Sequence, residues 1–135
     1  MDVRALHHVA MAVEDLDDAV ETYRRMFGAE VERRGTLDDQ GVEAVYLRLG
    51  DGRVELVSAL AEDTPVGRFL AKRGPGMHHV AFEVGDVRRA VDEVASAGGD
   101  VVEPGIRAGL GGHEVAFVHP ESLYGVLAEV MESNG

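Results

Sequence analysis

Apolar residues alternate with other residues in several short stretches of the chain and recur at helical spacing in others. The alternation over residues 6–13 predicts a strand, and Asp15 is a candidate N-cap for a helix after it. This helix should end at Gly28, because glycine readily takes the left-handed backbone that closes a helix. Its apolar face consists of Leu16, Ala19, Val20 and Tyr23. The first stretch therefore predicts a strand followed by an amphipathic helix.

The same patterns predict the elements of the remaining chain. Three strands are expected near residues 29–34, 42–49 and 53–58, with Gly50-Asp51-Gly52 as a hairpin signal between the last two. A short helix near 65–72 has Pro65 close to its first turn. The later elements are a strand over 77–84, a helix over 86–97 and strands near 100–103, 113–118 and 126–131. The order of one strand, one helix and three strands thus occurs twice.

The two halves of the chain are also similar in sequence. Residues 7–31 align without gaps on residues 78–102, and ten of the 25 aligned positions are identical. Self-similarity at a fixed offset indicates duplicated structural units. We therefore expect one α+β domain over residues 1–135. It should consist of two tandem βαβββ modules, about 5–60 and 76–133, whose sheets close around a shared cleft.

Each module begins with two adjacent histidines, of which only one can face the cleft. Adjacent strand residues point to opposite faces of a sheet, so His7 and His8 must diverge, as must His78 and His79. The stripes that contain His7 and His78 are large and apolar and should pack against the helices. The alternate stripes carry small or polar residues, which suit a ligand cavity. The predicted cleft histidines are therefore His8 and His79.

Two glutamates occupy corresponding places near the ends of the modules. Glu55 lies between Val54 and Leu56, so its side chain projects away from an apolar stripe, and Glu129 interrupts an otherwise apolar strand. A single glutamate of this kind is usually salt-bridged, and a single strand histidine is usually a core residue. Burying a lone carboxylate is nevertheless costly unless a cation pairs with it. Corresponding pairs of both residue types in duplicated units therefore predict a site for one divalent metal ion.

The predicted ligands of this ion are His8, Glu55, His79 and Glu129. Imidazole and carboxylate suit Co, Mn, Ni, Zn and Fe about equally, so the ligands leave the identity of the metal open. Four such ligands would make the ion formally neutral, with one or two positions for water or substrate oxygens. This composition is typical of a Lewis-acid site rather than of a closed structural one. The absence of cysteine excludes thiolate ligands, disulfide bonds and a cysteine nucleophile.

Charge and hydropathy exclude several kinds of partner. A net charge of −12 argues against nucleic acid, whose phosphates require basic patches. No apolar run approaches the roughly 20 residues that are needed to span a bilayer. The N-terminal sequence MDVRALHHVA lacks the apolar region and the cleavage site of a signal peptide. We therefore expect a cytoplasmic protein that binds neither nucleic acid nor membranes.

Four long segments make the sequence resemble a known family. They are LHHVAMAVEDLDDAVETY, DDQGVEAVYLRLGDGRVELV, DTPVGRFLAKRGPGMHHVAFEV and GGHEVAFVHPESLYGVLAEVME, in this order over nearly the whole chain. With them the chain resembles the vicinal-oxygen-chelate superfamily and, within it, the methylmalonyl-CoA epimerases. The resemblance implies a glyoxalase-like fold, an acyl-CoA substrate and a homodimer, and it puts the same four residues at the metal-binding positions. It further implies interconversion of (R)- and (S)-methylmalonyl-CoA through a metal-stabilised enolate.

Epimerisation requires a base on one face of the substrate and an acid on the other. Some family members carry a base glutamate two residues after the valine of a QGV segment. Here Gln40-Gly41-Val42 is followed directly by Glu43, and the strand alternation puts Glu43 on the helix side and Ala44 in the cleft. The preferred catalytic candidate is therefore Glu129, which would leave the metal as in related isomerases. Glu43 is the second candidate, and Glu83 is a weaker one.

Other functions remain compatible with the same fold. A glyoxalase-I-like lactoylglutathione lyase shares the ligand set, whereas a resistance-type binding protein uses such a cleft without metal. An extradiol dioxygenase needs two histidines and one carboxylate on iron, so Glu55 as a fourth ligand weighs against it. The HHVA pairs and the VHPESLYGVL ending favour the epimerase. The family often has a basic residue after His119-Pro120, where this chain has Glu121, so the contacts to CoA stay unassigned.

Overall fold

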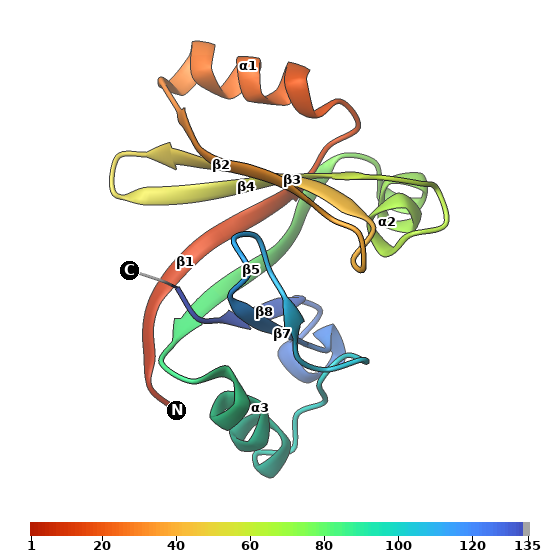
Figure 1. The fold of residues 1–135 in the computed structure, drawn as a ribbon. Helices are drawn as coiled ribbons and strands as arrows, with labels where there is room; N and C mark the ends of the chain where they lie inside the picture. The colour runs from red at the N-terminus through yellow and green to blue at the C-terminus, as the bar shows by residue number, and fades with distance from the viewer. Residues whose placement is uncertain (134–135) are drawn as a thin grey trace. The chain divides into compact units, whose positions relative to one another are not determined.

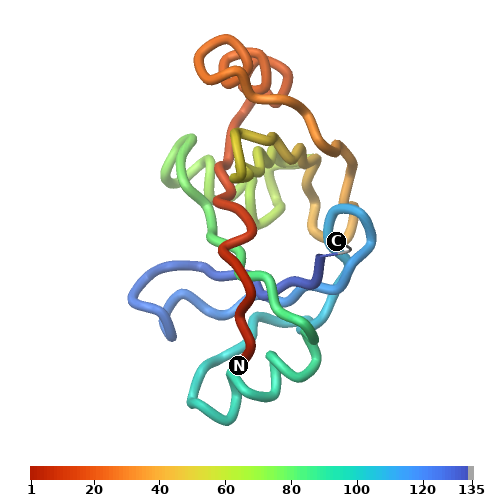
Figure 2. Tube along the Cα trace, turned by 90° about the vertical axis from the view of Figure 1, so that its left-hand side faces the viewer, coloured from red at the N-terminus to blue at the C-terminus, as the bar shows by residue number. Residues whose placement is uncertain are grey.

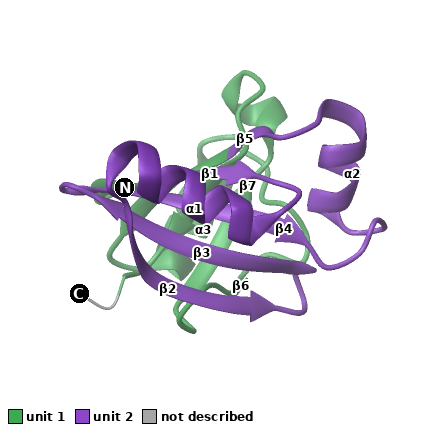
Figure 3. Ribbon diagram, turned by 90° about the horizontal axis from the view of Figure 1, so that it is seen from above, with its two compact units in different colours: residues 1–7, 79–135 green, residues 8–78 purple. Residues whose placement is uncertain are grey.

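The computed structural model describes residues 1–133, and the chain divides into two compact units. One unit is His8–His78, and the other combines residues 1–7 with the chain from His79 onward, as the two colours of Figure 3 show. The boundaries fall between the members of the two histidine pairs. Both units follow the predicted order of one strand, one helix and three strands, so the α+β fold with two βαβββ modules is confirmed.

The unit His8–His78 is built around a sheet with the strand order β2-β3-β4-β1. Its elements are β1 (Val3–Ala12, which starts in the other unit), α1 (Leu16–Phe27), β2 (Glu30–Leu37), β3 (Val42–Leu49), β4 (Gly52–Ala59) and α2 (Pro65–Arg73). The strands β2, β3 and β4 are antiparallel neighbours, whereas β4 lies parallel to β1. The helix α1 covers one face of this sheet (Figure 1). The last strand of the module thus lies beside its first.

The core of this unit lies between α1 and the sheet. Its buried members are Leu16, Val20, Ala29, Val45, Leu47 and Leu56. Met11 and Val13 of the N-terminal stripe pack against this cluster, and the hydroxyl of Tyr23 lies 2.8 Å from the sulfur of Met11. The stripe that contains His7 therefore packs on the helix side, as its bulk predicted.

The ends of α1 follow the sequence signals. The side chain of Asp15 accepts a hydrogen bond of 3.0 Å from the backbone N–H of Asp18, and this satisfies a donor that the first helical turn leaves open. At the other end Gly28 has φ of 67°, which is the left-handed conformation that a residue without Cβ adopts at little cost. Asp86 caps the helix of the second module in the same way, at 3.1 Å from the N–H of Arg89.

Replacing Asp15 by alanine is expected to lower the free energy of unfolding by about 1 kcal/mol, because the first turn of α1 loses its capping acceptor. Urea denaturation followed by circular dichroism measures this change. Glu21→Ala is the matched control, since this exposed carboxylate lies in the middle of the same helix. An equal loss of stability in both variants would contradict the capping role.

The other unit has the strand order β5-β8-β7-β6. Its elements are β5 (Gly76–Val84, which starts in the first unit), α3 (Val87–Ser96), β6 (Arg107–Ala108), β7 (Glu114–Val118), a 3-10 helix (Pro120–Leu123) and β8 (Ala128–Met131). Here too the last strand of the module, β8, lies parallel to the first, β5. A core of Val84, Val87, Ala90, Ala116 and Val130 joins α3 to the sheet. Figures 1 and 2 both place the N-terminus of the chain beside α3.

One predicted strand is wrong. Residues 100–103 form only an isolated bridge between Val101 and Val118, and the edge strand β6 begins later, at Arg107. The reason is the turn at Pro104 and Gly105, since proline has no N–H for a strand ladder and Gly105 has φ of 92°. The second module therefore has a much shorter edge strand than the first.

The helix α2 begins as the proline predicted, with a cap that the pattern did not identify. The hydroxyl of Thr64 accepts a hydrogen bond of 3.0 Å from the backbone N–H of Gly67. The bonded position is close-packed, because a Cβ on Gly67 would lie 2.5 Å from the carbonyl oxygen of Ala61.

Among residues 1–133, no helix is long and apolar enough to cross a membrane.

Candidate functional site

The unit His8–His78 contains a buried pair of one imidazole and one carboxylate. His8 lies on β1 and is 1% exposed, and Glu55 lies on the parallel strand β4 and is 6% exposed. The strand register pairs Glu55 with Ala10, two residues after His8, so both side chains project from the same face of the sheet. Nε2 of His8 lies 3.4 Å from Oε1 of Glu55.

The other unit contains the corresponding pair. His79 on β5 and Glu129 on β8 are each 6% exposed, and the register pairs Glu129 with Ala81, again two residues after the histidine. Nε2 of His79 lies 3.9 Å from Oε2 of Glu129. Each module thus places one histidine of its first strand beside one glutamate of its last strand. In both modules the glutamate pairs with the residue two positions after the histidine.

These distances suit metal ligands. Nitrogen and oxygen ligands lie about 2.0–2.2 Å from an ion such as Zn²⁺, so neighbouring ligand atoms of one ion are about 3–4 Å apart. Both measured separations fall in this range. A carboxylate is also costly to bury without a compensating cation. Each pair therefore fits two ligands of a divalent ion.

The neighbouring histidines have other surroundings. His78 is half-buried, and its ring makes an edge-to-face contact with the ring of Phe69 on α2, with 5.0 Å between the centroids. His7 is 7% exposed and lies on the stripe of Met11, which packs toward α1. Of the two adjacent histidines in each module, the second is therefore the one that lies beside a buried glutamate.

Two aromatic residues next to the histidines were not identified from the sequence. The ring of Tyr46 lies 5.1 Å from that of His8, and the ring of Phe117 lies 5.3 Å from that of His79. The antiparallel register places Tyr46 opposite Glu55 and Phe117 opposite Glu129, so the two aromatic residues occupy equivalent places. The duplicated arrangement thus extends beyond the ungapped sequence match.

Glu43 lies on the opposite face of its sheet. Its strand partner is Ser58, whereas the adjacent Ala44 is fully buried on the face of Glu55. Nε of Arg34 donates a hydrogen bond of 2.9 Å to Glu43, and Nη1 of Arg34 lies 2.7 Å from Asp17 in the first turn of α1. These bonds, first that to Glu43, raise the pKa of Arg34 above its ordinary value. Glu43 is therefore part of an ion-pair cluster on the helix side.

The remaining candidates lie toward the surface. Glu83 is half-buried on β5, on the face of His79. His119 is exposed, and its Nδ1 accepts a hydrogen bond of 3.3 Å from the backbone N–H of Glu121 at the start of the 3-10 helix. His119 thus closes the turn that leads toward β8.

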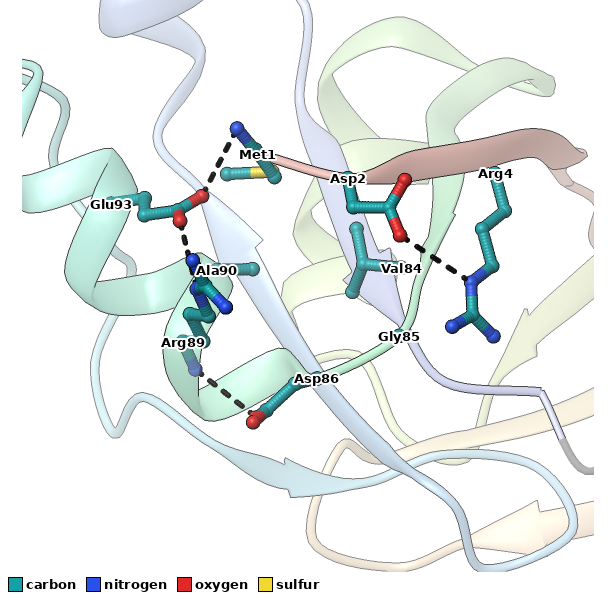
Figure 4. A pocket seen from close by; sticks show the side chains of 9 residues that line it. All are labelled: Met1, Asp2, Arg4, Val84, Gly85, Asp86, Arg89, Ala90 and Glu93. Carbon is teal, nitrogen blue, oxygen red and sulfur yellow. Dashed lines mark hydrogen bonds and ion pairs between the residues drawn. The ribbon is translucent and has the colours of Figure 1, made fainter.

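A cavity of about 360 Å³ lies at the N-terminus of the chain (Figure 4). Its charged groups pair with one another, since the Met1 ammonium lies 3.2 Å and Nε of Arg89 lies 3.1 Å from the carboxylate of Glu93. The hydrogen bond from the terminal ammonium is the main reason why the pKa of Glu93 is lower than usual. The cavity is therefore lined by surface ion pairs. The buried His–Glu pairs are the stronger candidates for a catalytic site.

Comparisons with known proteins match this chain and its fold to one family. Residues 7–117 match the model of the Glyoxalase/Bleomycin resistance protein/Dioxygenase superfamily. The chain is 38% identical over 127 residues to the ethylmalonyl-CoA/methylmalonyl-CoA epimerase of Cereibacter sphaeroides, covering 93% of this chain and 95% of that protein. It is 35% identical to the mitochondrial methylmalonyl-CoA epimerase of Homo sapiens, over 95% of this chain and 73% of that one. The chain belongs to the methylmalonyl-CoA epimerase family.

Solved structures of this family have the same fold. The methylmalonyl-CoA epimerase of Mycobacterium tuberculosis superposes with a TM-score of 0.93 at 32% identity, over 98% of this chain and 90% of that chain. A methylmalonyl-CoA epimerase in complex with methylmalonyl-CoA and NH4+ gives a TM-score of 0.95 at 33% identity, over 99% and 97% of the two chains. A lactoylglutathione lyase of Arabidopsis thaliana is 32% identical, but the chain spans only 43% of its length. The solved epimerases of this family thus match the chain over at least 90% of their own length.

Proposed function

We propose that this chain interconverts (R)- and (S)-methylmalonyl-CoA and that His8, Glu55, His79 and Glu129 together hold one divalent ion for this reaction. The observation that carries the proposal is the pair of buried His–Glu arrangements at equivalent places in a chain of the methylmalonyl-CoA epimerase family. The relatives named as epimerases of methylmalonyl-CoA support the substrate. The ligand chemistry allows Co, Mn, Ni, Zn or Fe.

The reaction requires removal of the proton from C2 of the substrate. The C2 proton of methylmalonyl-CoA lies between a thioester and a carboxylate, and its loss places negative charge on the thioester oxygen. A bound divalent ion supplies Lewis-acid stabilisation of that charge. Because both imidazoles and both carboxylates are buried, their positions are fixed by the sheets, and such preorganised groups need little rearrangement during the reaction.

In this proposal Glu129 is both a ligand and the group that moves the proton, for which it would have to leave the ion. Its carboxylate takes the proton from C2 on one face of the substrate, and an acid on the opposite face returns one. The low exposure of Glu129 keeps bulk water from competing for that proton. Glu43 is a less suitable acid or base than Glu129, because it lies on the helix side of its sheet, in an ion pair with Arg34.

The experiment that tests the function measures deuterium wash-in at C2 of methylmalonyl-CoA in D2O, together with the metal content of the purified protein. Exchange at C2 with about one metal ion per chain is the expected result. Formation of lactoylglutathione from methylglyoxal and glutathione without exchange at C2 would instead identify a glyoxalase-I-like lyase. The predicted homodimer is tested separately, by the mass of the protein in solution.

Replacing Glu43 by glutamine is expected to leave the rate of C2 exchange within about threefold of the wild type, because general-base losses are much larger. Loss of the exposed ion pair with Arg34 should lower the free energy of unfolding by less than about 1 kcal/mol. The matched control is Glu32→Gln, which removes a similar surface pair with Arg53. A Glu43→Gln variant that keeps its metal and stops exchange would show that Glu43 is the base.

A further inference from the structure

Each His–Glu pair has an aromatic ring that reaches it from two strands away. In the unit His8–His78 the strand β4, which carries Glu55, lies between β1 with His8 and β3 with Tyr46. Neighbouring strands lie about 4.8 Å apart, so β1 and β3 are separated by roughly 10 Å. The centroids of the rings of His8 and Tyr46 are nevertheless only 5.1 Å apart. Both side chains therefore lean toward each other across the strand that holds the glutamate.

The other unit repeats this arrangement. Its strand β8, which carries Glu129, lies between β5 with His79 and β7 with Phe117. The ring centroids of His79 and Phe117 are 5.3 Å apart, at an interplanar angle of 87°. In such an edge-to-face contact the positive edge of one ring meets the negative face of the other, so the contact favours particular orientations of the two rings. The contact thus restricts rotation of the imidazole.

The aromatic rings also cover the carboxylates from the side away from the histidines. Tyr46 lies directly opposite Glu55 in the strand register, and Phe117 lies directly opposite Glu129. In the second module the ring belongs to an apolar cluster with Ala81, Val115 and Met131. A carboxylate that turned toward such a wall would lose polar contacts, which is costly in apolar surroundings. The wall therefore favours the orientation in which the glutamate faces its histidine.

The two modules share the aromatic ring at this place and not a hydroxyl, since one has tyrosine and the other phenylalanine. The common feature is therefore the aromatic surface against the imidazole. A histidine can present either ring nitrogen to an ion, so a ligand histidine is usually held by a neighbouring group that fixes its ring. In both pairs Nε2 is the nitrogen that lies beside the glutamate.

We propose that Tyr46 and Phe117 are positioning residues of the metal site. Each ring holds the imidazole of its own module with Nε2 turned to the glutamate before an ion binds. The inference rests on the proposed function, since it takes His8 and His79 as ligands of the ion. A ligand that is already oriented loses less conformational entropy when the ion arrives. The two rings therefore raise the affinity for the metal by acting through the histidines.

Removing each ring tests the proposal. The variants Tyr46→Leu and Phe117→Leu should each weaken binding of Co²⁺ about 10- to 100-fold, the usual effect of losing a group that orients a ligand. Tyr46→Phe keeps the ring and should bind Co²⁺ within about threefold of the wild type, well short of such a loss. Competition with a chromogenic chelator measures the affinity. Unchanged affinity in both leucine variants, or an equal loss in Tyr46→Phe and Tyr46→Leu, would overturn the role of the rings.

A matched control separates positioning from a general loss of packing. Tyr23 is a half-buried aromatic residue of α1, and its hydroxyl contacts Met11 on the helix side of the sheet. Tyr23→Leu should lower the unfolding temperature, as loss of packing does, and leave the affinity for Co²⁺ unchanged. An equal loss of affinity in Tyr23→Leu and Tyr46→Leu would contradict the proposal. Methionine, which adapts to irregular space, replaces leucine wherever a leucine variant does not fold.

The metal-free protein supplies a second readout, so the two proposals can fail separately. Two-dimensional NMR of the imidazole rings should show one sharp set of signals for His8 and for His79 in the wild type and in Tyr46→Phe. In Tyr46→Leu the signals of His8 should double or broaden, because its ring gains a second orientation. One sharp set in both leucine variants would overturn the positioning role. A wild-type protein that binds no Co²⁺ contradicts the proposed metal site, and the NMR comparison then still tests the rings.

Discussion

Replacing Glu129 by glutamine is expected to slow C2 exchange of methylmalonyl-CoA by about 100- to 10,000-fold, the range that a positioned general base contributes. Glutamine keeps the size of the side chain and an oxygen that can bind metal, but its amide cannot accept a proton at neutral pH. Because Glu129 is 6% exposed, water has little access to take over its role. Mass spectrometry of the substrate after incubation in D2O measures the exchange.

The matched control is Glu121→Gln, an exposed carboxylate in the 3-10 helix before the same strand, which should exchange at the wild-type rate. The metal content of both variants separates two roles of Glu129. If saturating metal restored exchange in Glu129→Gln, this residue would be a ligand and not the base. Full exchange without added metal would contradict both roles.

Replacing His8 by asparagine should weaken metal binding by at least about 100-fold, because loss of a direct ligand exceeds the 10- to 100-fold effect of a second-shell change. His7→Asn is the matched control, since His7 is similarly buried but projects to the helix side of the same strand. Competition with a chromogenic chelator measures the affinity, and thermal unfolding verifies that both variants fold. Equal metal loss in the two variants would contradict the assignment of His8 as the ligand.

The periodicity of the chain predicted the fold well because one simple rule governs each element. In a strand, alternate residues share a face, and this rule separated His8 from His7 and Glu43 from Ala44 before any tertiary contact was known. Capping signals at Asp15 and Gly28 likewise act locally and were confirmed. The repeat then made local inferences about one module applicable to the other.

Features that depend on strand pairing could not be predicted in this way. Tyr46 and Phe117 lie beside the histidines because the register places each opposite a glutamate, and the connections that set the register differ between the modules. A tight hairpin at Gly50 joins β3 to β4, whereas β7 reaches β8 through the 3-10 helix. The prediction of a strand at 100–103 was wrong for a related reason. The turn at Pro104 and Gly105 limits the pairing of this segment with β7 to one bridge.

The parallel pairing of the first and last strands within each module links ligand binding to chain closure. His8 and Glu55 come together only when the last strand of the module pairs with the first, and the same holds for His79 and Glu129. A partly folded module therefore brings a lone imidazole to an ion and binds it weakly. An ion that binds only the module with paired first and last strands stabilises this folded form by mass action. Metal in the medium would therefore shift the equilibrium from partly folded chains to fully folded ones. If one ion binds both His–Glu pairs, as proposed, it would stabilise the folded form of both modules.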